Sequence, residues 1–215
     1  MATRRLLTYI ALDTSGSMNG EPIVSLNVGM HSLLAAVRSD PYTLENVWLS
    51  IWTFNTTVKN ILPLVEAEQA YFDDCVCPQS GATFTGLCLE QIVLDVKKNI
   101  RPNTLGQKGD WAPLLVLFTD GRPSDTAAFR RAVAEIKQLK FSKIVACAAG
   151  PKADVNFLQQ LTPDVVSLDT ADSSSFAQFF QFLSSTISAQ SHSVGANVGN
   201  GSSSVLPPPP AVINP

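Results

Sequence analysis

Short apolar runs alternate with segments of helical periodicity through most of this sequence. The apolar runs predict strands over residues 6–12, 47–54, 114–119, 143–149 and 165–168. Helical periodicity covers 23–37, 87–96, 129–139, 155–161 and 172–187. Such alternation is typical of a doubly wound, mostly parallel sheet with helices on both faces, which is a three-layer α/β/α fold.

Two segments refine this prediction. Residues 114–119 are apolar throughout, as expected of a central parallel strand that is buried on both faces. The strand at 47–54 leads through a turn into a second run at 58–62, which predicts one antiparallel edge strand. The pattern weakens from 63 to 81, where a short helix is predicted over 66–72.

The length of 215 residues suits one α/β domain followed by a tail. We expect the domain to cover residues 1–188. Residues 189–215 are rich in Ser, Gly and Asn and contain four consecutive prolines at 207–210. This composition is typical of a flexible tail with polyproline character.

Composition argues against several classes of protein. The net charge is −3 and no basic run is present, so a nucleic-acid partner is not expected. The apolar stretches are shorter than a membrane span, and the first one leads into Asp13 without a cleavage-site pattern. The 4 cysteines do not form a disulfide framework. We therefore expect a cytoplasmic protein in a reducing compartment, with no membrane partner.

The first strand ends in a cluster of oxygen-bearing side chains. Asp13, Ser15 and Ser17 alternate across Gly16, so a sharp turn can direct all three toward one point. Carboxylate and hydroxyl oxygens are hard ligands, suited to a small hard cation such as Mg²⁺. The same spacing also suits an ordinary turn or a helix N-cap. Three ligands cannot complete an octahedron, so other loops must contribute.

Two further loops supply candidates. Thr83 precedes a predicted helix, and Asp120 directly follows the central strand. Because ligands collect beyond the carboxyl ends of parallel strands, we expect these loops and the Asp13 loop to share one rim of the sheet. Each residue alone could be a cap or a turn, but their joint occurrence favours a metal site.

These three segments resemble the von Willebrand factor type A (VWA) domain family. The matching pieces are residues 13–17, 81–86 with Leu89, and 118–121, so the resemblance covers roughly residues 4–188. It implies a Rossmann-like VWA fold with a metal-ion-dependent adhesion site (MIDAS). Ser15 and Ser17 would bind the cation directly, and Thr83 directly or through water. Asp13 and Asp120 would act largely through water and hydrogen bonds.

The resemblance also implies a cofactor and a partner. The cofactor would be Mg²⁺, with Mn²⁺ as an alternative, and one metal position would stay open for an Asp or Glu of a partner protein. Ca²⁺ is less favoured because the direct ligands are few and mostly hydroxyls. Residues 119–125 and 62–64 are similar to a bacterial subgroup linked to tellurium resistance. That subgroup implies stress signalling beside a Ser/Thr kinase and a phosphatase.

A metal-dependent hydrolase or phosphatase is the alternative from another class. Residues 81–86 begin like a phosphate-binding loop, but Leu87 and Cys88 stand where Lys and Ser/Thr are needed. The 2 histidines, His31 and His192, are not placed to act as a general base. We therefore expect a binding module rather than an enzyme.

Residues on the rim are candidates for partner contacts. Met18, Asn19, Phe84 and Arg122 belong to the loops around the predicted metal. Met18 and Phe84 could equally pack locally, and Arg122 could pair with Asp125 or with the partner's acid.

Another cluster lies in the weakly patterned region. Asp73, Asp74, Cys75 and Cys77 could hold a soft metal, or they could form an ordinary variable loop, because a complete zinc-ligand set is missing.

Overall fold

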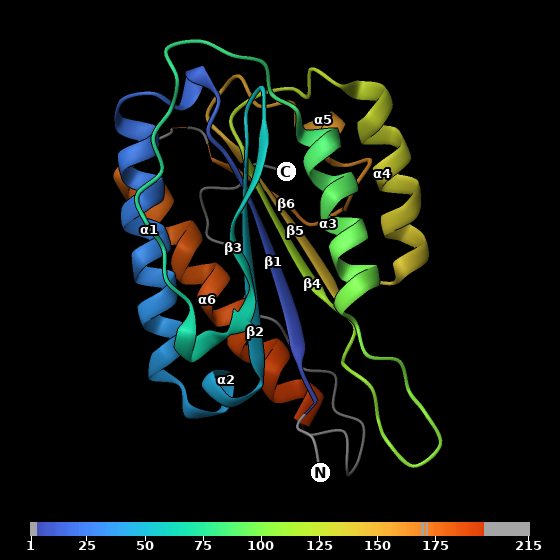
Figure 1. The fold of residues 1–215 in the computed structure, drawn as a ribbon. Helices are drawn as coiled ribbons and strands as arrows, with labels where there is room; N and C mark the ends of the chain where they lie inside the picture. Colours follow the sequence, from blue (N-terminus) through green and yellow to red (C-terminus); the bar gives the residue numbers. More distant parts are fainter. Residues whose placement is uncertain (1–3, 169, 171, 196–215) are drawn as a thin grey trace.

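The computed structural model describes residues 4–168, 170 and 172–195 (Figure 1). A six-stranded sheet runs through its centre in the order β3-β2-β1-β4-β5-β6. The strands are β1 Leu6–Asp13, β2 Val47–Phe54, β3 Val58–Glu66, β4 Leu114–Thr119, β5 Lys143–Ala149 and β6 Val165–Leu168. Neighbouring strands are parallel except β2 and β3, which form an antiparallel hairpin at one edge. The predicted three-layer fold with one antiparallel edge strand is confirmed.

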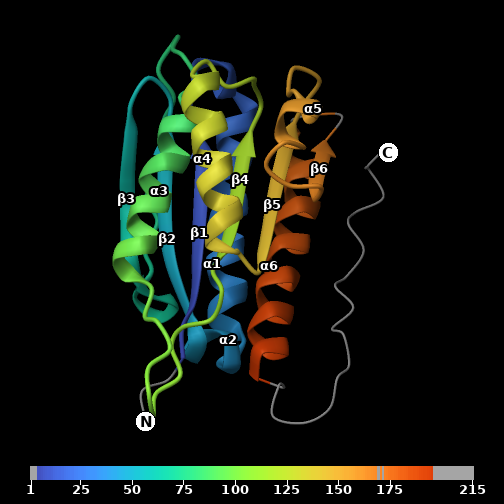
Figure 2. The same cartoon turned by 90° about the vertical axis from the view of Figure 1, so that its right-hand side faces the viewer.

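Helices cover both faces of this sheet. They are α1 Glu21–Ser39, α2 Pro41–Asn46, α3 Thr85–Asn99, α4 Thr126–Leu139, α5 Val155–Leu158 and α6 Ser173–Gly195. Helices α1, α2 and α6 lie on one side, and α3, α4 and α5 lie on the other (Figure 1). In the view of Figure 2, α3 and α4 pass in front of the sheet, and α1 and α6 lie behind it. None of the helices in the described ranges is long and apolar enough to cross a membrane.

Strand β1 shows why the sheet lies between two layers of helices. All eight of its residues are buried, and alternate side chains enter two separate cores. Leu6, Ile10 and Leu12 join the core beneath α1 and α6. Leu7 and Tyr9 join the core beneath α3 and α4. Because side chains of a strand alternate between faces, only a strand covered on both sides can be apolar throughout.

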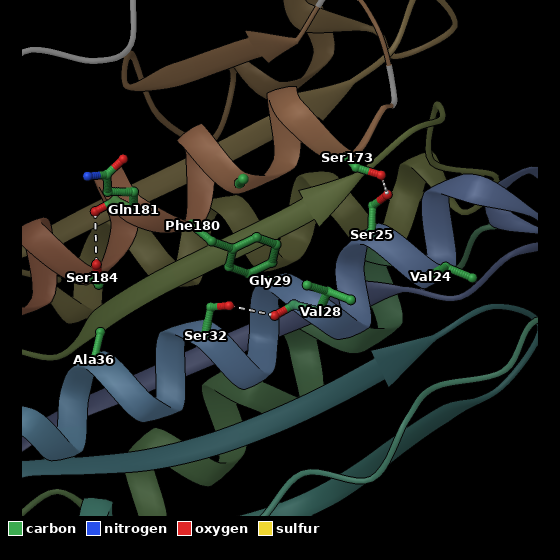
Figure 3. Close-up of a pocket in the computed structure, with 11 residues that line it drawn as sticks. Val24, Ser25, Val28, Gly29, Ser32, Ala36, Ser173, Phe180, Gln181 and Ser184 are labelled. Atoms are coloured by element: carbon green, nitrogen blue, oxygen red, sulfur yellow. Dashed lines mark hydrogen bonds between the residues drawn. The ribbon is translucent and has the colours of Figure 1, made fainter.

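Close helix packing on the first face depends on Gly29. A Cβ atom at this position would lie 2.0 Å from Cδ2 of Phe180, so the aromatic ring of α6 rests directly on the α1 backbone. Figure 3 shows Phe180 beside Gly29, where α1 and α6 line a groove. Val24 and Val28 stand on the outer side of α1, where they are 60% and 61% exposed.

Two predictions of local structure need correction. The helix predicted over 66–72 is absent, because β3 continues to Glu66 and only a 3-10 turn, η2 Ala67–Gln69, follows. Helix α1 ends at Ser39, and α2 begins directly afterwards because the Asp40 carboxylate accepts from the backbone N–H groups of Tyr42 and Thr43. The last helix, predicted over 172–187, continues to Gly195. The prolines at 207–210 lie outside the described residues.

The strand order reverses between β1 and β4. From β1 the chain moves outward to β2 and β3, and from β4 it moves the opposite way to β5 and β6. The loops that follow two such neighbouring strands diverge, and ligands of open α/β sheets bind in the resulting crevice. Here those loops begin at Asp13 and Thr119, at the end of the sheet opposite the N-terminus (Figure 1).

Candidate metal centre

A chain of hydrogen bonds joins four of the five predicted metal-site residues. The backbone N–H of Ser15 donates to Oδ1 of Asp13 at 2.8 Å. The hydroxyl oxygens of Ser15 and Ser17 are 3.1 Å apart, and Ser17 Oγ donates to Oδ1 of Asp120 at 2.8 Å. The Asp13-x-Ser15-x-Ser17 turn and the residue after β4 therefore meet, as the sequence predicted.

Local structure explains how the two serines reach this point. After β1 the chain enters a single 3-10 turn, η1 Gly16–Met18. A Cβ at Gly16 would lie 2.8 Å from the Cα of Ser80, so only glycine lets the segment before α3 pass so close. The turn leaves Ser15 buried and Ser17 exposed. One hydroxyl thus faces the interior of the site and the other faces its opening.

Thr83 comes to the same place from the third loop. A Cβ at Gly121 would lie 3.7 Å from Oγ1 of Thr83, so the Thr83 hydroxyl lies against the residue that follows Asp120. The backbone of Thr83 is paired with Ser124 in both directions, through Thr83 N–H to the Ser124 hydroxyl (3.1 Å) and Ser124 N–H to the Thr83 carbonyl (2.9 Å). All five predicted ligands are therefore brought together.

Asp125 holds the third loop in a way the sequence did not predict. The Asp125 carboxylate accepts from the N–H groups of Gly86 and Leu87, at 3.0 and 2.7 Å. It thus satisfies the first turn of α3, because the N-cap residue Phe84 makes no side-chain hydrogen bond to that turn. This contact locks the Thr83 loop to the Asp120 loop.

Thr119 is a further site residue that sequence reasoning missed. Its hydroxyl donates to Oδ2 of Asp13 at 2.6 Å, so both oxygens of that carboxylate are fixed. A signal was present, because Thr119 is the one hydroxyl residue in an otherwise apolar strand and it directly precedes Asp120.

The two carboxylates are placed where their charge is unfavourable. Burial raises the pKa of Asp13 to about 6, against the lowering effect of hydrogen bonds from Thr119 and Ser15. Burial also raises the pKa of Asp120, and the two groups repel one another. A divalent cation beside them would offset both effects. Two carboxylates and three hydroxyls form a hard donor set that fits such an ion.

The residues predicted to contact a partner differ in how exposed they are. Met18 is 0% exposed and belongs to the core beneath α1, so its prediction as a docking residue is wrong. The 3-10 turn that exposes Ser17 directs the next side chain inward. Asn19 is exposed and Phe84 is half-buried on the rim.

Arg122 is exposed, and it does not pair with Asp125, which was one of the two partners considered for it. Its Nε lies 3.7 Å from Oδ2 of Asp154, and the guanidinium lies over the ring of Phe157 at 5.5 Å. Asp125 is occupied by the α3 N-terminus instead.

The cysteines at 75 and 77 behave as packing residues. Both pack against the core beneath α1 and are half-buried. Burial is the main cause that raises their pKa values, to about 12 for Cys75 and about 11 for Cys77, so both are protonated at neutral pH. Within the described residues, no group of three or more His, Cys, Asp or Glu could hold a metal. The soft-metal interpretation therefore has no support.

Comparisons with known proteins identify the fold. No family model and no curated protein matches the sequence. The pilus adhesin SpaC of Lactobacillus rhamnosus GG superposes with a TM-score of 0.65 at 13% identity, over 88% of this chain and 31% of its own. A von Willebrand factor type A protein of Catenulispora acidiphila superposes with a TM-score of 0.60 at 14% identity, over 86% and 43%.

A third solved structure carries a metal. Proximal thread matrix protein 1 of the mussel byssus, described with a zinc-occupied MIDAS motif, gives a TM-score of 0.62 at 17% identity, over 87% of this chain and 48% of its own. The present chain thus spans less than half of each of these three solved chains. It has the three-layer α/β/α fold of von Willebrand factor A domains.

Proposed function

We propose that this protein is a binding module that recognises a partner protein through a divalent cation held by Asp13, Ser15, Ser17, Thr83 and Asp120. One observation carries the proposal. Three loops that are distant in sequence place their oxygen side chains together at the switch point of the sheet, with Ser15, Ser17 and Asp120 in direct hydrogen-bond contact. A zinc-occupied MIDAS motif in a protein of the same fold gives further support.

The chemistry of the ligands favours Mg²⁺, because the direct ligands are few and mostly hydroxyls. Ca²⁺, which takes about six to eight oxygen ligands, would require a larger set. Mn²⁺ resembles Mg²⁺ in its preference for oxygen ligands and is the alternative.

The five residues have different roles in binding the ion. Ser15 and Ser17 bind the ion directly, Thr83 does so directly or through water, and Asp13 and Asp120 act through water and hydrogen bonds. Because the direct ligands are uncharged, the bound ion keeps enough positive charge to attract a carboxylate. A partner Asp or Glu then takes the remaining position.

We infer that the protein acts by binding and not by turnover. His31 lies on α1, where its Nε2 is 2.8 Å from Asp74 Oδ1, and His192 lies near the end of α6, 3.0 Å from Asp40. Both are therefore engaged outside the set of loops that meets at Asp13. A hydrolase at this site would have to work without a histidine base.

The finer assignment is a TerY-like role in bacterial tellurite and stress resistance. It rests on the similarity of residues 119–125 and 62–64 to that subgroup, and it places a Ser/Thr kinase or a phosphatase among the partners. A cytoplasmic location belongs to the same proposal. It is supported by the free thiols of Cys75, Cys77, Cys88 and Cys147, which suit a reducing compartment.

The test combines metal binding with partner capture. Mg²⁺ is first titrated calorimetrically into wild type and Asp13→Ala. Both proteins are then immobilised and exposed to a lysate of the source organism, with Mg²⁺ or with EDTA. Retention of one protein only by wild type with Mg²⁺ supports the proposal, and its identity tests the kinase and phosphatase assignment. Phosphoester turnover that is lost in Asp13→Ala would favour the hydrolase instead.

A further inference from the structure

A second cavity adjoins the metal site on the β3 side. It has a volume of about 450 Å³. One wall is the β2–β3 hairpin, with Asn55, Lys59 and Ile61, and the other is the 71–76 segment. We call this space the hairpin cleft. It exists because this part of the sheet is covered by an extended segment and not by a helix (Figure 1).

The 71–76 wall is anchored on its far side. The Asn27 side chain of α1 accepts from the N–H of Cys75 at 2.9 Å and donates to its carbonyl at 3.0 Å. His31 bonds to Asp74, and the rings of His31 and Phe72 meet edge to face at 5.3 Å. These contacts fix the segment to α1 and leave its other side facing the hairpin, so the cleft is a built feature.

The cleft adjoins the metal site through Thr14 and Asn55. Thr14, which stands between Asp13 and Ser15, lines it. Asn55 also lines it, and its side chain donates to Oγ1 of Thr14 at 3.2 Å while its carbonyl accepts from Phe84 N–H at 2.9 Å. A segment whose carboxylate is at the metal can therefore continue directly into the cleft.

The chemistry of the cleft indicates what it binds. Ile61, Tyr71 and Val76 are 41%, 68% and 82% exposed, an unusual collection of large apolar side chains on one surface. Asp73 and Asp74 are exposed beside them, and Lys59 is the one basic side chain among the lining residues. This surface favours an apolar side chain followed by a basic one.

The opposite side of the rim carries two basic side chains. Arg122, which pairs with Asp154, and Lys152 are exposed on the loops after β4 and β5, which lie across β1 from the hairpin. An acidic segment is thus favoured at the metal and toward β5, and it is disfavoured near Asp73 and Asp74. This difference in charge between the two sides of the rim defines the direction in which the bound segment runs.

We propose that the hairpin cleft binds the part of the partner beside its metal-binding carboxylate, and that this part carries a large apolar side chain and a Lys or Arg. The inference rests on the proposed function, because it takes the carboxylate at the metal as its starting point. It adds a recognition sequence of the form acid, apolar, basic, which the metal alone cannot select.

The experiment uses a phage-displayed library of nine-residue peptides with a fixed central Asp and all other positions randomised. The whole protein is the target, with Mg²⁺ or with EDTA. We expect Mg²⁺-dependent enrichment of peptides that have an aromatic or large aliphatic residue and a Lys or Arg on one side of the Asp.

Variants then locate the contact. Ile61→Ser with Val76→Ser should weaken binding of the enriched peptide about tenfold or more, a loss expected for an apolar contact of about 1.4 kcal/mol. Asp73→Asn, which leaves the contact between His31 and Asp74 in place, should weaken the preference for the basic residue. The matched control is Val24→Ser with Val28→Ser, which alters equally exposed side chains beside the groove of Figure 3 and should change binding less than about twofold. Mn²⁺ binding, followed by electron paramagnetic resonance, should be the same in all variants.

The outcomes separate the two proposals. Enrichment of Asp peptides without a flanking preference, or equal binding by cleft and control variants, overturns the cleft assignment and leaves the proposed function standing. A protein that binds Mn²⁺ but enriches no peptide in a metal-dependent way contradicts both.

Discussion

The hydroxyl of Thr119, the last residue of β4, donates a 2.6 Å hydrogen bond to Oδ2 of Asp13, the last residue of β1. The bond joins the two strands at the point where the order of the sheet reverses. It fixes the Asp13 carboxylate before any metal arrives. Preorganisation of this kind improves metal affinity, because the ligand set loses less freedom on binding.

Thr119→Val should lower Mg²⁺ affinity about 10- to 100-fold, as expected when a residue that orients a metal ligand is lost. Valine keeps the size and branching of the side chain but cannot donate to Asp13. Thr119→Ser restores the donor and should recover most of the affinity. Calorimetric titration of the three proteins is the measurement. Equal affinities for Val and Ser variants would show that Thr119 serves only packing.

Asp13→Asn should stabilise the metal-free protein at pH 7.5 by about 2–3 kcal/mol, because each pKa unit corresponds to about 1.4 kcal/mol. Burial raises the pKa of this carboxyl from 3.8 to about 6. The folded state therefore binds a proton more readily than the unfolded chain. The cost of the charge is fully present above pH 6 and disappears as the pH falls toward 4.

The measurement is urea unfolding in EDTA at pH 7.5 and 5.0. The difference between Asp13→Asn and wild type should shrink at the lower pH, where the wild-type carboxyl is itself mostly neutral. A variant that is less stable than wild type at both pH values would contradict the assignment of an unfavourable buried charge.

Mg²⁺ should stabilise the wild-type protein against heat. At a concentration 100 times its dissociation constant the ion contributes about 2.7 kcal/mol. For a domain of this size that corresponds to a rise of about 5–10 °C in Tm. Removal of the ion by EDTA should reverse this rise in Tm. Ser17→Ala, at an exposed position, should leave the metal-free Tm nearly unchanged and lose the response, whereas Ser32→Ala on α1 should retain it.

Alanine substitutions at two glycines near the Thr83 loop should have very different effects on stability. A Cβ at Gly86 would lie 2.2 Å from the backbone N of Phe129, and backbone cannot move aside as a flexible side chain can. Gly86→Ala should therefore cost about 3 kcal/mol or more by forcing α3 and α4 apart, and it should also weaken metal binding. At Gly81 the nearest atom, the Thr56 methyl, is 3.3 Å away. Gly81→Ala should cost less than about 0.5 kcal/mol in urea unfolding.

The regular elements could be predicted well because their signals are local. The strands at 47–54, 114–119, 143–149 and 165–168 agree with the structure in both ends, since a buried strand needs an unbroken apolar run. The segment from 66 to 84 was harder. It is anchored to α1 through contacts such as Asn27 with Cys75, and such contacts leave no periodic pattern.

The sequence by itself determined the fold class and the five candidate ligands, because strand periodicity and the Asp13-x-Ser15-x-Ser17 spacing are properties of neighbouring residues. Only the tertiary structure decided which side chains turn inward or change partners. Met18 enters the core, Asp125 binds the start of α3, and Arg122 pairs with Asp154. These outcomes depend on segments that approach from far along the chain, and no local pattern records which of them will arrive.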